Sequence, residues 1–228
     1  MIVSSGKDIY TDKNGVLINS KGFSDAEALE EAASLYAAMV SKHIRSLSEI
    51  RIKAWDIEFY KELHKVLLGG IYPWAGELRK VDIGRPCDHV AYEPWQNIEA
   101  KTTAVFSFIN EWNLFKDKSD VWKILDLAIV FSNLKNIQPF REGSTCTALL
   151  FTSLLARQSG MAIDWSLLDI KRFSMYQVEA RYGDLTNLVI AFSEITAQID
   201  ELPYIHAPLI IADGKEHDLV KEIIGSDI

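Results

Sequence analysis

The feature that most constrains the fold is a polar segment between two apolar helical runs. Residues 138–147 have the sequence QPFREGSTCT, preceded by DVWKILDLAIVFSNLKNI at 120–137 and followed by TALLFTSLLARQ at 147–158. Both flanking runs are apolar enough for buried helices. A short glycine-containing loop that feeds a helix start suits an anion, because the first-turn N–H groups lack intrahelical partners and the helix dipole favours negative charge. The sequence therefore predicts an anion site between two core helices.

Helical periodicity dominates the rest of the chain and predicts an all-α fold. A capping box at 24–27 (SDAE) begins the first expected helix. The further expected helices lie at 55–68, 94–112, 120–137, 147–159, 169–182 and 186–198. Between 78 and 92 apolar residues recur around Gly84-Arg85-Pro86, which predicts a short hairpin with a long turn. We expect one domain over 1–200 and an acidic tail of unassigned role at 203–228.

Composition narrows the class of protein. The chain has 228 residues, of which 48% are hydrophobic and 11% aromatic, enough for a globular core. Its net charge of −8 argues against nucleic acid as the main partner. Cys87 and Cys146 have no metal-ligand spacing and favour free thiols in a reducing compartment. No apolar run is long enough to span a membrane, so we expect a cytoplasmic protein or a secreted bacterial effector.

Two segments carry a family resemblance. Residues 138–147 resemble the signature of the Fic (filamentation, Fido-fold) family, HPFxxGNGR or HPFREGNTRT, and residues 71–79 (IYPWAGELR) resemble the family's IYPWAGExR segment. The similarity extends from about residue 8 to about residue 193. It implies a helical bundle with a small β-hairpin flap at about 78–92. It also implies a relation to enzymes that transfer AMP from ATP to a target hydroxyl.

Three positions depart from the signature. Gln138 stands where the family has a histidine base, and an amide has no useful basicity although general-base catalysis supplies a factor of ~10²–10⁴. Cys146 replaces an arginine that would clamp phosphates, and such arginines can be worth ~10³–10⁵ in rate. Ser144 replaces an asparagine and can still donate a hydrogen bond.

The positions that match the signature indicate that the loop could still bind a nucleotide. By the resemblance, Glu142 is the residue that would hold Mg²⁺ and the flap would hold an extended target segment. The expected nucleotide-binding residues are Arg141, Gly143, Ser144 and Thr145. The expected target-binding residues of the flap are Val81, Ile83, His89 and Val90.

The leading hypothesis is a catalytically impaired Fic-domain protein that binds a nucleotide or a partner, either a protein target or an antitoxin-like protein. One alternative is an active enzyme with altered phosphate-group transfer, in which His89 of the flap compensates for the lost base. Another is an adenylyltransferase inactivated by substitution. A nucleophilic Cys146 is a minor reading, and His64 is expected to be an ordinary surface or boundary histidine. No inhibitory (S/T)xxxE(G/N) segment is recognisable in the sequence.

Overall fold

The computed structural model describes residues 3–4, 8–43, 54–84, 92–111, 115 and 117–198. Within these residues the fold is predominantly helical, as the sequence predicts. The elements in chain order are β1 (Val3–Ser4), α1 (Ala26–His43), α2 (Ile57–Leu68), β2 (Ile83–Gly84), η1 (Trp95–Asn97), α3 (Ile98–Glu111), α4 (Asp120–Ile137), α5 (Ser144–Gln158), β3 (Met161–Ile163), η3 (Trp165–Leu167), α6 (Ile170–Arg181), α7 (Thr186–Ile195) and β4 (Thr196–Gln198).

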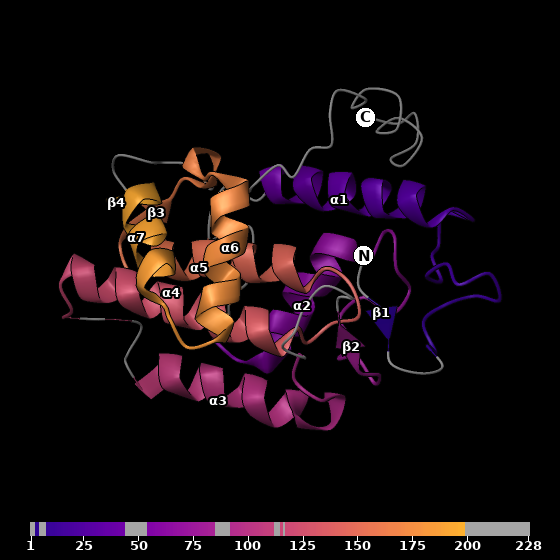
Figure 1. Cartoon of the computed structure of the whole chain (residues 1–228), viewed down its shortest axis with the longest axis horizontal. Helices are drawn as coiled ribbons and strands as arrows, with labels where there is room; N and C mark the ends of the chain where they lie inside the picture. The colour runs from indigo at the N-terminus through magenta and orange to yellow at the C-terminus, as the bar shows by residue number, and fades with distance from the viewer. Residues whose placement is uncertain are drawn as a thin grey trace.

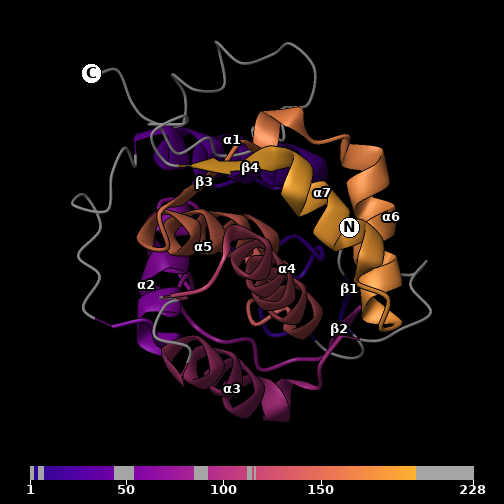
Figure 2. The ribbon, with the colours of Figure 1, turned by 90° about the vertical axis from the view of Figure 1, so that its left-hand side faces the viewer.

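Helices α4 and α5 form the centre of the molecule. Figure 2 shows them surrounded by α1 above, α2 on the left, α3 below and the α6–α7 pair on the right. Helix α5 packs against α4, α2 and β3, while α4 also packs against α3, α6 and α7. The loop that joins these two central helices is the predicted anion segment, so the core itself positions the site.

Helix α5 is buried on nearly all sides because its sequence is apolar around the whole circumference. Its polar side chains satisfy their hydroxyl groups within the helix. The Thr152 and Ser153 hydroxyls donate to the carbonyls of Ala148 and Leu149, at 2.7 Å and 2.9 Å. At the centre of the core, the Phe151 ring contacts rings of α2, α3 and Trp55.

The predicted hairpin at 78–92 takes a different form in its described half. Strand β2 pairs antiparallel with β1, with Val3 opposite Gly84 and Ser4 opposite Ile83. The N-terminus thus adds a strand to the flap region (Figure 1). Residues 85–91, which include Cys87, His89 and Val90, lie outside the described residues, as does the tail at 203–228.

Three expected helix ends differ from the structure. The helix after the loop begins at Ser144 rather than Thr147, because the loop residues themselves form its first turn. The helix expected at 94–112 begins as the 3-10 turn η1 and becomes α3 at Ile98. The helix expected at 186–198 ends at Ile195, and the next three residues pair with β3 in a second small antiparallel sheet. That sheet is absent from the sequence prediction, since runs of three residues give no periodicity.

Among the described residues, no helix is both long enough and apolar enough to cross a membrane.

Candidate functional site

Two left-handed residues shape the loop between α4 and α5. Gln138 ends α4 with φ 48° and ψ 68°, and its backbone N–H donates to Leu134 O at 3.1 Å. Gly143 precedes α5 with φ 78°. A Cβ atom at position 143 would lie 2.0 Å from Leu68 Cδ1 and 3.2 Å from His64 Nε2. Position 143 therefore requires glycine both for its backbone conformation and for space.

The Gln138 side chain points into the protein. It is buried, and its Nε2 donates to the carbonyl of Lys135 at 3.0 Å, which keeps the amide in the last turn of α4. The backbone carbonyl of Gln138 accepts a hydrogen bond from Arg79 Nε at 2.8 Å. The amide at the family's base position is therefore buried and held by the last turn of α4.

Ser144 fixes the loop through its hydroxyl. Ser144 Oγ accepts from Phe140 N at 2.9 Å and donates to Phe140 O at 3.1 Å. Thr147 Oγ1 donates to Gly143 O at 2.8 Å. Both hydroxyls are thus used within the loop and the first turn of α5. What Ser144 offers an anion is its backbone N–H, since no side chain caps α5.

Cys146 is not an activated thiol. Its Sγ lies 3.0 Å from Gly143 O, to which it donates. Burial, followed by the charge of Glu142, raises the pKa of the Cys146 thiol to about 12. A helix N-terminus alone would lower the pKa of a thiol. Burial therefore outweighs the effect of the helix dipole on Cys146. Burial therefore argues against a nucleophilic role for Cys146.

Glu142 lies half-buried beside the loop glycine. Its Oε1 accepts a hydrogen bond from Gly143 N at 3.1 Å. Burial raises the pKa of the carboxyl, although that N–H and Arg141 act in the opposite direction. Among the described residues, no three His, Cys, Asp or Glu side chains gather closely enough to hold a metal ion. A single carboxylate fits Mg²⁺ only where phosphates supply further oxygens, which is how Mg²⁺ is commonly bound.

Arg141 is engaged with the N-terminal segment. Its Nε and Nη2 both lie 2.8 Å from Asp8 Oδ2, and both side chains are largely buried. This ion pair joins residues 133 positions apart. The structure thus places Arg141 in a structural contact beside the loop.

His64 is the buried support of the loop, not the surface or boundary residue expected from sequence. Its Nδ1 accepts from Gly76 N at 2.8 Å, so Nε2 carries the proton and donates to Glu142 O at 2.9 Å. The ring stacks on Phe140 with centroids 3.8 Å apart. Burial lowers the pKa of His64 to about 4. With both nitrogens engaged and the ring neutral at pH 7, His64 cannot replace the missing base.

Lys135 is a charged neighbour of the site that sequence reasoning missed. It lies in the last turn of α4, is 8% exposed, and donates from Nζ to Thr145 Oγ1 at 2.5 Å. Thr145 belongs to the first turn of α5, so a positive charge stands next to the expected anion site. A lysine three positions before Gln138, within one helical turn of the loop, is the signal that could have revealed it.

Arg79 connects the loop to the flap. Besides Gln138 O, its guanidinium donates to Val81 O at 2.6 Å, to Ile137 O at 3.2 Å and to Glu93 O. Its backbone N–H donates to the carbonyl of Pro139 at 2.9 Å. Of the predicted flap residues, Val81 is half-buried and Ile83 is buried in β2, whereas His89 and Val90 lie outside the described residues.

The helical core and its α4–α5 loop define a Fic-type domain. The family model described as the Fic/DOC family matches residues 54–156, which include α2 to α5 and the whole loop. This match supports a Fic-family protein, as do the curated relatives and solved structures below.

Curated relatives agree. The chain is 29% identical over 189 residues to "Protein adenylyltransferase VbhT" of Bartonella schoenbuchensis, a match that covers 78% of this chain and 36% of that protein. It is 25% identical over 200 residues to "Probable protein adenylyltransferase Fic" of Escherichia coli, covering 86% of this chain and 96% of the relative. The chain thus spans about a third of VbhT and nearly all of the Escherichia coli protein.

Solved structures share the fold. The BepC effector protein of Bartonella tribocorum, with bound AMPPNP, has a TM-score of 0.73 at 21% identity and covers 83% of this chain and 96% of its own. The N-terminal Fic domain of a Bartonella quintana Bep effector, with bound ADP, has a TM-score of 0.75 at 20% identity and covers 83% and 94%.

Proposed function

We propose that this chain is a Fic-domain protein that binds a nucleoside triphosphate at the α4–α5 loop and transfers AMP poorly. The observation that carries this proposal is the inward position of Gln138, whose amide is bonded to Lys135 O and buried in α4. The loop retains a frame for phosphates, and at the family's base position it has an amide that cannot take a proton.

Three features support nucleotide binding. Gly143 adopts the left-handed conformation that opens the loop, and the first turn of α5 has no side-chain cap. Lys135 adds a buried positive charge at Thr145. Two structural neighbours hold AMPPNP and ADP in their crystals. Glu142 is the residue that would hold Mg²⁺, and the ion would neutralise phosphate charge there.

The impairment follows from what the transfer requires. The acceptor hydroxyl must lose its proton as it attacks phosphorus, and neither Gln138 nor the neutral, enclosed His64 can take that proton. The leaving pyrophosphate gains negative charge, and the Cys146 thiol provides no cation to offset it. Loss of the base lowers the transfer rate by a factor of ~10²–10⁴, and loss of the arginine lowers it by a factor of ~10³–10⁵.

We also propose that the chain binds a protein partner. The named relatives are protein adenylyltransferases, so a target or antitoxin-like protein that docks along the flap, near Val81 and Ile83, is the partner we expect. We place the protein in the cytoplasm, or in a host cell as a secreted effector.

Calorimetry with ATP, with and without Mg²⁺, tests the binding half of the proposal. We expect saturable binding that strengthens with Mg²⁺ and weakens in Glu142→Gln. No detectable heat under either condition would contradict it.

An adenylylation assay with labelled ATP and a cell extract tests the catalytic half. The intact chain is expected to label no protein above background, including itself. A triple variant, Gln138→His with Ser144→Asn and Cys146→Arg, restores the signature. Labelling by the intact chain at the rate of an active relative would instead favour an enzyme with altered chemistry.

A further inference from the structure

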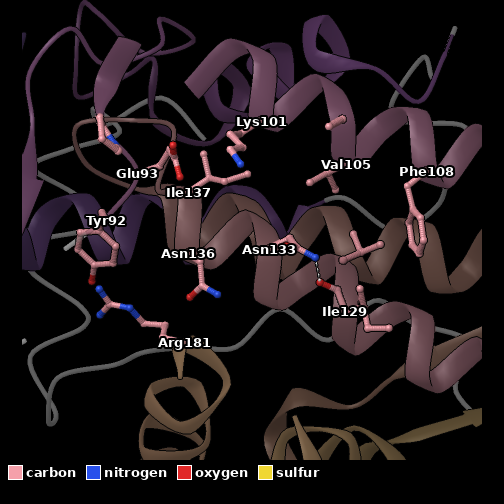
Figure 3. A pocket seen from close by; sticks show the side chains of 13 residues that line it. Tyr92, Glu93, Lys101, Val105, Phe108, Ile129, Asn133, Asn136, Ile137 and Arg181 are labelled. Carbon is pink, nitrogen blue, oxygen red and sulfur yellow. Dashed lines mark hydrogen bonds between the residues drawn. The ribbon is translucent and has the colours of Figure 1, made fainter. Parts of the chain in front are cut away.

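A groove separate from the α4–α5 loop runs between α3, α4 and the end of α6. Its volume is about 620 Å³. Figure 3 shows that the two ends of the groove differ in polarity. The apolar end is formed by Val105 and Phe108 of α3 with Ile129 of α4, and the polar end gathers Tyr92, Glu93 and Arg181. None of residues 138–147, all of which are described, lines the groove.

The groove has the size of a small-molecule site. Ligand pockets usually measure about 300–1,000 Å³ and combine an apolar lining with a few polar groups. Here the polar groups include two amides, Asn133 and Asn136, on consecutive turns of α4. Asn133 Nδ2 donates to Ile129 O at 2.9 Å (Figure 3).

The charges at the polar end favour an anion. Lys101 of α3 is exposed at the rim, and the Arg181 guanidinium lies over the Tyr92 ring, 4.4 Å from its centroid. Among the described residues that line the groove, the one carboxylate is that of Glu93, whose Oε1 accepts from Asn97 Nδ2 at 2.8 Å. These described lining residues therefore carry more positive than negative charge, in a chain whose overall charge is −8.

We propose that this groove binds a small amphipathic monoanion, a carboxylate that bears an apolar chain. The carboxylate lies between Lys101 and Arg181, and the chain lies along Val105, Phe108 and Ile129. This site is independent of the nucleotide site proposed above, so either proposal can fail without the other.

Calorimetry with sodium decanoate tests the inference, with decylammonium as a probe that has the same chain and the opposite charge. We expect decanoate to bind with a Kd of about 1 mM or tighter. Decylammonium is expected to bind about tenfold more weakly, as two partly exposed ion pairs would give. Absence of decanoate binding, or equal binding of both probes, would overturn the proposal.

Variants locate the site. The double change Lys101→Glu with Arg181→Glu should reverse the preference between the two probes, and Lys101→Glu alone should reduce it. Lys171→Glu, an equal charge change on the exposed start of α6, should have no effect. Ala104→Trp, at an exposed groove residue, should weaken both probes without lowering the melting temperature.

ATP distinguishes this groove from the loop site. Saturating ATP with Mg²⁺ is expected to leave the decanoate affinity unchanged. Displacement of decanoate by ATP would show that the groove is part of the nucleotide site and would refute a separate one. Binding that survives both Ala104→Trp and the double charge reversal would place decanoate elsewhere and would equally refute it.

Discussion

Replacing Arg79 by methionine is the most direct test of how the loop is held. The Arg79 side chain is 1% exposed, and it donates to four backbone carbonyls, those of Val81, Glu93, Ile137 and Gln138. Two of these end α4, where carbonyls have no intrahelical partner. Methionine preserves much of the volume and removes every donor, so the change isolates the polar contribution.

The expected loss is large. A hydrogen bond to a charged group contributes about 1.5–3 kcal/mol, and a buried acceptor left without a partner costs about 1–3 kcal/mol. Because water reaches some of the freed carbonyls and the four bonds are not additive, we expect a total loss of about 3–5 kcal/mol. Against a typical stability of about 5–15 kcal/mol, this leaves a marginal domain. At about 2–4 °C per kcal/mol, the melting temperature should fall by roughly 10 °C or more.

Urea unfolding of the intact chain, followed by tryptophan fluorescence, measures this loss. Arg172→Met is the matched control, because the Arg172 side chain is 73% exposed and, among the described residues, forms an ion pair with Asp169, the N-cap of α6. The control should change stability by about 0.5 kcal/mol or less. Arg79→Lys should fall between the two, since an ammonium can reach some of the carbonyls. If Arg79→Met unfolds within about 1 kcal/mol of the original chain, the guanidinium does not hold the loop.

Three further predictions concern the loop and its supports. The folded-state pKa of His64 is about 4, below the ordinary 6.5, so the unfolded chain binds more protons between these values. Stability should therefore fall as pH decreases from 6.5 to 4, by about 3 kcal/mol for this group, and His64→Gln should lack that component in urea titrations at each pH. A steeper pH dependence in the variant would contradict this reasoning. The pKa of Cys146 is about 12, so at pH 8 its thiolate fraction is about 1,000-fold lower in the folded chain than in urea. Iodoacetamide should therefore modify it about 1,000-fold more slowly in the folded chain, as mass spectrometry of its peptide would show, and equal rates would refute its burial. Lys135→Met should weaken ATP binding about tenfold in calorimetry, whereas Lys123→Met on the same helix should not, and unchanged affinity would remove Lys135 from the phosphate site.

The sequence predicts the helical fold well because its helices are long and strongly apolar. The runs at 120–137 and 147–158 correspond to α4 and most of α5, and the family resemblance is confirmed. The missed sheet shows the limit of periodicity. Strands of two or three residues, such as β1 and β4, depend on distant partners that no local pattern contains.

The site was predicted by type of residue but not by orientation. The sequence predicts that Gln138 is a poor base and that Cys146 cannot clamp phosphates. Only the structure shows that the Gln138 side chain bonds back to the last turn of α4. Asp8 and His64 act through long-range contacts, which include those to Arg141 and to the carbonyl of Glu142, and such contacts leave no periodic pattern in the sequence. Burial also reverses the sign expected for the Cys146 pKa, since exposure cannot be read from a helix position alone.

The ion pair between Asp8 and Arg141 has a consequence for how the chain is made. A ribosome releases the N-terminal segment long before Arg141 emerges, because the two residues are 133 positions apart and α1 to α4 lie between them. The Asp8–Arg141 ion pair can therefore form only after most of the domain has been synthesised. Long-range contacts of this kind form late, because loop closure is costly. The α4–α5 loop is thus completed near the end of folding, and a nascent chain arrested before residue 141 would lack this contact.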